Sequence, residues 1–249
     1  MAALVLSSMS STPIAAAHVA PSVDDNNRYV TITPFGDRVR VSYIVFFGDV
    51  PGAIERRMID ANRDGQISNA ESHAYAVAFG AQLQAVLEAK LDAVMAPFIW
   101  SSIEVGMGSP EVAAGTFSID LVAYACVASH PAGRATHHFT FHDRFRVPHP
   151  GETEVKVEDA PGITIERARI GATDDPSHDY RFAGPGGPIA DQGLDLVFTA
   201  APNASVTADS TCAASAREPS HTRLFVLVGL CVAMVGVSGA LVLRRRART

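Results

Sequence analysis

Apolar and polar residues alternate in the first part of the chain, and this pattern predicts a β-hairpin. Residues 28–33 and 38–47 are rich in β-branched and aromatic residues that alternate with polar ones, as in half-buried strands. Residues 34–37, with the sequence Pro-Phe-Gly-Asp, separate the two runs and favour a turn. We therefore expect two strands joined by a tight connection.

From residue 49 the pattern changes to the spacing of helices. Asp49 is expected to cap a short helix that begins at Pro51, a favoured first helical position, and ends at Ile59. Farther along, apolar residues recur at three- and four-residue spacing and predict one face of a long helix that ends at Pro97. These apolar residues are Phe79, Leu83, Val86, Leu87, Leu91 and Val94. The sequence thus predicts a helix–loop–helix unit over residues 51–96.

Beyond Pro97 the pattern returns to that of strands. Three runs, at residues 99–105, 116–128 and 135–147, alternate or are rich in β-branched residues, and further candidates lie at residues 154–158, 163–170 and 194–199. Several short strands with regular turns are typical of an antiparallel sandwich. The expected fold class is α+β, an antiparallel β-sandwich-like domain over residues 21–199 with one helix–loop–helix insertion.

Residues 60–71 fill every constrained position of the EF-hand calcium pattern, D-x-[DN]-x-[DN]-G-x5-E. Calcium prefers oxygen ligands, and such a loop offers them at fixed positions along its length. The predicted ligands are the side chains of Asp60, Asn62 and Asp64, the backbone carbonyl of Gln66, Ser68 through a bridging water, and the carboxylate of Glu71. Gly65 stands at the sharp turn, and Ile67 is the apolar residue that usually pairs with a neighbouring loop. We therefore expect the chain to bind Ca²⁺.

This loop departs from ordinary EF-hands in two ways. The residue four positions before the first ligand is usually large and apolar, but here it is Arg56. EF-hands normally occur in pairs, and no second loop has the right spacing, because the acidic residues 174–179 lack the glycine and the final glutamate. A lone loop lacks the paired geometry with which calcium sensors open. Calcium is therefore expected to clip the domain together.

The two ends of the chain predict an exported, membrane-anchored protein. Residues 1–20 are expected to form a signal segment, and Ala15-Ala16-Ala17 resembles a cleavage site, although the positive charges of a usual signal are missing. Residues 200–222 are rich in Ala, Ser, Thr and Pro and predict a stalk. Residues 224–243 carry no charge and predict a transmembrane helix about 30 Å long.

The charges on either side of this segment predict its orientation. Arg244, Arg245, Arg246 and Arg248 follow it, and positive charge beside a span marks the cytoplasmic side. The C-terminus is thus expected in the cytoplasm and the domain in the periplasm or on the cell surface. Small residues at four-residue spacing, Gly229, Ala233, Gly236 and Ala240, leave open a weak homodimer through this helix.

The net charge limits the classes of partner that the chain can bind, and the cysteines suggest a disulfide. Of the 20 Lys and Arg residues, four follow the predicted span, which leaves 16 against 26 acidic residues outside. A net charge of about −10 excludes nucleic acid and anionic membrane surfaces, which require basic surfaces. Cys126 and Cys212 are candidates for a disulfide in an oxidising compartment. Alternatively, Cys212 belongs to a lipid-attachment or sorting signal.

Histidines form a second, weaker metal hypothesis. Five of them crowd into residues 130–149, and strand alternation places His138 and His142 on the same polar face, about 13 Å apart. A single zinc ion cannot bridge that distance without a partner strand, so a solvated sheet face is the alternative interpretation. The sequence has no H-E-x-x-H, G-x-S-x-G or P-loop pattern, and we expect no enzymatic activity.

The runs D-R-V-R-V-S-Y at residues 37–43, F-F-G-D-V-P at 46–51 and E-R-R at 55–57, followed by the calcium loop, resemble a bacterial family. This family is the EF-hand-bearing extracytoplasmic domain found ahead of some nickel/cobalt exporter-like proteins and in stand-alone anchored proteins. The resemblance implies an extracytoplasmic domain near a metal-handling system. This chain departs from the transporter members because it has one predicted span instead of a multi-helix transporter, so transport itself is not implied. Two functions therefore remain open. One is a calcium-stabilised structural or binding protein, and the other is an accessory for nickel, cobalt or copper handling or transport, with a membrane-protein partner.

Overall fold

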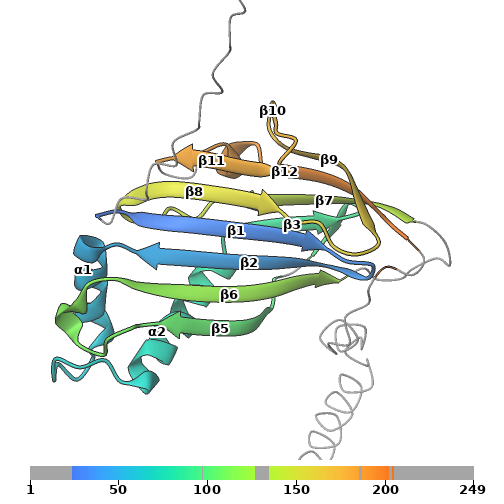
Figure 1. Cartoon of the computed structure of the whole chain (residues 1–249). Coiled ribbons are helices and arrows are strands. Elements are labelled where there is room, and N and C mark those ends of the chain that lie inside the picture. Colours follow the sequence, from blue (N-terminus) through green and yellow to red (C-terminus); the bar gives the residue numbers. More distant parts are fainter. Residues whose placement is uncertain (1–23, 97, 127–134, 185–186, 202–203, 205–249) are drawn as a thin grey trace, which may run out of the picture.

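The computed structural model describes residues 24–96, 98–126, 135–184, 187–201 and 204 of the 249-residue chain. They form two six-stranded sheets with a few short helices, a β-sandwich-like arrangement (Figure 1). Among these residues, no helix is both long enough and apolar enough to cross a membrane. The predicted signal segment, the span at residues 224–243 and nearly all of the predicted stalk lie outside the described residues.

The first sheet contains the predicted hairpin. In spatial order, its strands are β11 (Asp179–Ala183), β8 (Pro150–Val157), β1 (Asn26–Pro34), β2 (Arg38–Phe47), β6 (Phe117–Cys126) and β5 (Trp100–Gly106). Strands β1 and β2 pair antiparallel from Asn27↔Phe46 to Pro34↔Val39, which confirms the hairpin. Strand β8, however, pairs parallel with β1. The prediction of an antiparallel sandwich is therefore wrong for this pair, because the chain crosses from β7 of the other sheet through residues 144–149 and enters the first sheet beside β1 in the same direction.

The second sheet is antiparallel throughout. Its spatial order is β10 (Thr173–Asp174), β9 (Ile163–Ile170), β12 (Leu194–Ala200), β7 (Ala135–Asp143), β3 (Leu87–Leu91) and β4 (Val94–Met95). Strand β7 is shorter than the predicted run 135–147 and ends at Asp143. The short helix α3 (Gly187–Asp191) buries Ile189 beside this sheet and had no clear signal in the sequence.

The prediction of one long helix that ends at Pro97 is wrong. Helix α2 (Asn69–Gln84) ends after Leu83, and residues 87–91 form β3, which pairs with β7. Leu87 and Leu91 are four residues apart, so they suit a helix face, but they also suit a strand with Ala89 buried between them. The strand prevails because its backbone hydrogen bonds to β7 while its apolar side chains enter the core. The predicted helix–loop–helix unit therefore ends at residue 84.

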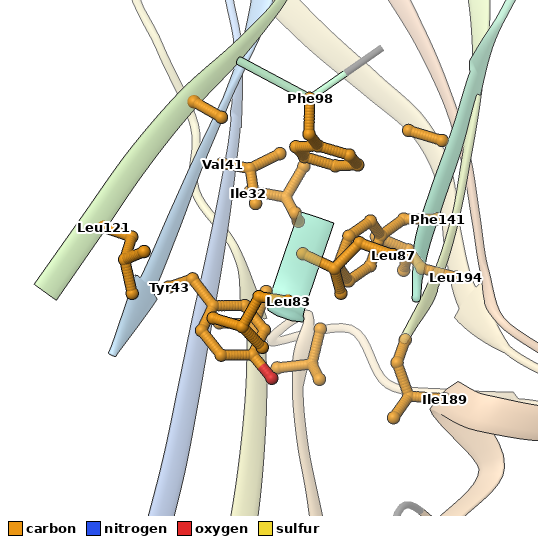
Figure 2. Packing of buried hydrophobic residues seen from close by; sticks show 14 of the residues in the cluster. Ile32, Val41, Tyr43, Leu83, Leu87, Phe98, Leu121, Phe141, Ile189 and Leu194 are labelled. Atoms are coloured by element: carbon orange, nitrogen blue, oxygen red, sulfur yellow. The ribbon is translucent and has the colours of Figure 1, made fainter. Parts of the chain in front are cut away.

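Helix α2 fills the space between the two sheets near β5 and β3. Leu83 is fully buried and lies between Tyr43 of the first sheet and Leu87 of the second (Figure 2). Gly80 permits the close approach, because a Cβ there would lie 3.1 Å from Leu121 Cδ2. The indole Nε1 of Trp100 donates to the carbonyl of Gly80 at 2.8 Å. The helix that follows the predicted calcium loop is thus anchored to the edge strand β5.

A buried ion pair joins the sheets. Arg28 Nη1 on β1 lies 2.8 Å from Asp143 Oδ2 at the end of β7, and the Tyr43 hydroxyl donates to the same oxygen at 2.8 Å. Arg28 Nη2 also donates to Thr153 Oγ1 on β8. Burial raises the pKa of the Tyr43 hydroxyl well above its usual value, so this group remains a proton donor. Charged and hydrogen-bonded partners make this the polar centre of the core.

Loop 60–71, the predicted calcium loop, and the end of the described domain lie at opposite ends of the sandwich. Ala204 packs against Gly36, in the turn between β1 and β2, where a Cβ would lie 3.1 Å from that of Ala204. Strand β2 runs away from this turn for 10 residues, about 33 Å, to reach α1 (Asp49–Ile59) (Figure 1). Helix α1 leads directly into the calcium loop.

Candidate metal centre

Helices α1 and α2 flank the candidate calcium loop, as an EF-hand requires. Helix α1 starts at Asp49 with Gly48 as its N-cap, so the expected cap Asp49 lies within the first turn instead. Helix α2 starts after Ser68, whose hydroxyl accepts from the backbone N–H of Glu71 at 3.2 Å, while Glu71 Oε2 accepts from the Ser68 backbone at 2.9 Å. This reciprocal capping box begins α2 within the loop itself.

Backbone N–H groups hold the loop's first three candidate side chains. Asp60 is buried, and its two carboxylate oxygens accept from the backbone of Asp64 at 3.2 Å and of Gly65 at 3.0 Å. Asn62 Oδ1 accepts from Asp64 N at 2.8 Å, and Asp64 Oδ1 accepts from Gln66 N at 2.8 Å. Gly65 has φ +83°, where side chains are disfavoured. The backbone thus curls around these oxygen atoms.

Glu71 closes the loop. Its Oε1 atom accepts from the backbone of Ala61 at 3.0 Å and of Asn62 at 3.3 Å, which brings the last predicted ligand back to the start of the loop. The hydroxyl and backbone N–H of Ser68, together with these two N–H groups, hold the pKa of the Glu71 carboxyl below its usual value. Glu71 is therefore a carboxylate at neutral pH, the form in which it can bind a cation.

The donor chemistry fits calcium, whereas the side-chain positions require adjustment. All predicted side-chain ligands offer oxygen, which calcium prefers. However, Asn62 Nδ2 donates to Asp64 Oδ2 at 3.0 Å, and within the described part of the chain no three His, Cys, Asp or Glu side chains converge as a metal site. Binding would require the Asn62 amide to turn and release Asp64. The calcium ligand set therefore stays a prediction.

A loop from the first sheet takes the place of the second EF-hand. This segment, residues 107–116, connects β5 to β6, and we call it the β5–β6 connection. Ile67 N donates to Pro110 O at 2.7 Å, Val112 N donates to Gly65 O at 3.2 Å, and Gln66 forms a β-bridge with Glu111. Ile67 is only 5% exposed. The sequence indicated that Ile67 needs a partner, but residues 107–116 carry no pattern that identifies them as that partner.

Arg56, the unusual residue of the entering helix, holds the same connection. Its side chain is fully buried and donates to five backbone carbonyls, those of Met107, Ser109, Glu111, Gly115 and Thr116. The guanidinium carbon also lies 5.6 Å from the centre of the Phe117 ring. Burial lowers the pKa of Arg56 from its usual value, yet arginine stays charged. Arg56 therefore binds the connection where an apolar residue could only pack.

Among the described residues, the structure adds no further ligand to the second metal site predicted at His138 and His142. His138 Nε2 lies 2.9 Å from Asp195 Oδ1, and the same carboxylate pairs with Arg167 and Arg169. His142 packs against Gly193, where a Cβ would lie 2.5 Å from the imidazole. His137, on the buried side of β7, contacts Asp92. The structure thus pairs His138 with a carboxylate and brings no metal-binding group of three to it among the residues described.

Cys126 is disulfide-bonded at the end of β6. Its predicted partner Cys212 lies outside the described residues, so this pairing stays a prediction.

Comparison with known proteins gives only weak similarities. No protein-family model matches the chain, and no curated protein matches it. The full-length major pilin RrgB from Streptococcus pneumoniae is 10% identical, with a TM-score of 0.17, over 73% of this chain and 37% of the pilin. A structure of the RrgB pilus backbone is 8% identical, with a TM-score of 0.16, over 73% of this chain and 51% of that one. At these TM-scores the pilins indicate neither fold nor function for this chain.

Proposed function

We propose that this chain is a calcium-binding, single-pass membrane-anchored protein whose extracytoplasmic domain has a structural or binding role and no catalytic activity. The observation that carries the proposal is the closure of the loop by Glu71, whose carboxylate reaches back to Ala61 and Asn62. Together with the left-handed Gly65, this closure brings the last predicted ligand back to the start of the loop, which supports the proposal.

The role of calcium follows from what surrounds the loop. Ile67 and Gly65 bond to the β5–β6 connection, and each flanking helix buries one face. The buried residues include Arg56 and Ile59 of α1 and Phe79 and Leu83 of α2. A bound ion would therefore join α1, α2 and that connection, which supports a stabilising clip. The proposed location rests on the predicted signal segment and span. The domain would lie in the periplasm or on the cell surface, and the C-terminus would lie in the cytoplasm.

Calorimetric titration of Ca²⁺ into the full-length protein in detergent micelles tests the proposal. We expect one site in the wild type, and we expect loss of binding in an Asp60→Ala, Glu71→Ala variant, which lacks both ends of the ligand set. An Asp174→Ala, Asp175→Ala variant is the matched control, because it removes the same charge from an acidic turn outside the loop. Absence of calcium binding by the wild type would refute the proposal.

A further inference from the structure

The β5–β6 connection forms a pocket that the calcium loop does not use. The pocket has a volume of about 260 Å³. Its lining includes the apolar residues Phe46, Met107 and Phe117, of which Phe117 has its ring buried in the core, and the hydroxyl-bearing residues Ser109, Thr116 and Ser118. Ligand sites typically combine such an apolar lining with a few polar groups, and they are usually larger than this. The pocket therefore suits a single ring with one hydrogen-bonding substituent.

Arg56 sets the shape of this pocket. Three of the lining residues, Met107, Ser109 and Thr116, give their backbone carbonyls to its guanidinium. The same guanidinium lies over the buried ring of Phe117, a residue that also contributes to the pocket lining. Because Arg56 comes from α1, the wall of the pocket is tied to the helix that enters the calcium loop.

The calcium loop holds the other side of the connection. The bonds from Ile67 to Pro110 and from Val112 to Gly65 fix the middle of the connection to the middle of the loop. Any movement of loop residues 65–67 on calcium binding would therefore pass to residues 110–112. A site that is fixed before its ligand arrives binds more tightly, since less ordering is required.

We propose that this pocket binds a small aromatic ligand with a hydrogen-bonding substituent, and that calcium in loop 60–71 raises the affinity by fixing the β5–β6 connection. The calcium dependence rests on the proposed function, whereas the pocket itself does not. The coupling is reciprocal, so the ligand also raises the affinity for calcium.

Phenol is a suitable probe, because it has one ring and one hydroxyl. Full-length protein labelled with ¹³C at its methionine methyl groups, in detergent micelles, would be titrated with phenol to about 10 mM with Ca²⁺ or with a chelator, a range chosen for weak fragment binding. Met107 lines the pocket, whereas Met58 and Met95 are exposed on other surfaces and serve as internal controls.

We expect a saturable shift of the Met107 methyl signal, larger than that of Met58 and Met95, with an affinity about fivefold or more higher with calcium, as is typical of coupled sites. An Ala114→Phe variant, which fills the pocket from its lining, should abolish the Met107 shift while calcium binding persists. A Met107 signal that moves no more than the two controls would overturn the binding site.

Val112→Pro tests the coupling separately. Glu111 is extended, with φ −68° and ψ 131°, and Val112 is the first residue of a 3₁₀ helix, so proline fits there and removes only the N–H that bonds Gly65. We expect this variant to bind calcium by calorimetry, with a smaller effect of calcium on phenol affinity. Calcium binding by the wild type without any change in phenol affinity would overturn the coupling alone. Absence of calcium binding would instead refute the proposed function.

Discussion

Replacing Arg56 with methionine would give the entering helix the apolar side chain that EF-hands usually carry there. Methionine is similarly long and flexible, so it retains much of the packing, but it removes all five hydrogen bonds to the β5–β6 connection. If apolar packing at this position were what matters, the variant would be as stable as the wild type or more so. We expect the opposite.

The magnitude follows from the burial of the five carbonyls. A hydrogen bond to a charged group contributes about 1.5–3 kcal/mol, and a buried carbonyl left unpaired costs about 1–3 kcal/mol. Only the bond to Gly115 O is wholly buried, whereas the other four carbonyls are partly buried and can turn to water. Removing a buried charge also recovers its desolvation penalty. The solvent access of four carbonyls and the recovered desolvation penalty offset most of the cost of the lost hydrogen bonds. The free energy of unfolding should therefore fall by about 2–4 kcal/mol.

Equilibrium urea unfolding of the full-length protein in detergent measures this change. The chain has a single tryptophan, Trp100 on β5, whose indole bonds to Gly80 of α2, so its fluorescence reports on the packing of α2 against the first sheet. Arg57→Met is the matched control. Arg57 is the exposed neighbour in the same helix, and its replacement should change stability by less than about 0.5 kcal/mol. Equal stability of the Arg56→Met variant and the wild type would refute the role assigned to Arg56.

Four further outcomes are expected. Saturating calcium, at about a hundred times its Kd, should add about 2.7 kcal/mol and raise the melting temperature of the wild type by several degrees, with no rise in the Asp60→Ala, Glu71→Ala variant, as scanning calorimetry would show. Because the folded pKa of Glu71 is depressed, its contribution to stability is present above the unfolded pKa of about 4.3 and is lost as pH falls through the folded value. Urea midpoints should therefore fall less steeply on acidification in Glu71→Gln than in the wild type, and parallel curves would contradict this. Asp143→Ala leaves a buried arginine unpaired and should cost about 3–5 kcal/mol by urea unfolding, while a loss under 1 kcal/mol would contradict that estimate. Nickel, zinc and copper should bind a His138→Ala, His142→Ala variant as weakly as the wild type in calorimetric titrations, and a clear loss of binding would favour the metal-accessory function.

The sequence predicted those parts of the fold in which one periodicity dominates. In β1 and β2, the alternation of apolar and polar residues and the Pro-Phe-Gly-Asp turn at residues 34–37 both predict a hairpin. Both strands appear with the expected pairing. Leu87 and Leu91 satisfy both helical and strand periods, and only the backbone of β7, distant in sequence, decides between them. The parallel pairing of β8 with β1 likewise depends on a crossover that local patterns do not contain.

The same distinction applies to the candidate metal centre. The spacing of ligands, the glycine and the capping residues of loop 60–71 are local, so the sequence could specify them, and the helices on both sides agree. The environment of the loop is not local. Arg56 is an anomaly in the sequence, and its reason emerges only when residues 107–116, more than fifty positions later, fold over it. The departure from the EF-hand pattern at Arg56 thus indicated a contact with another segment, which the sequence did not identify.

The position of the loop constrains what calcium could do in an anchored protein. The described chain ends at Ala204, beside the β1–β2 turn, and β2 separates this point from α1 by about 33 Å. Loop 60–71, the β5–β6 connection and the pocket therefore lie at the end of the sandwich opposite to Ala204, the point after which the predicted stalk and span would follow. Calcium bound there would act on the end of the domain that is distant from the predicted anchor. The clip and the pocket would then be parts of one arrangement, in which Arg56 and Ile67 transmit the effect of a bound ion to the pocket wall.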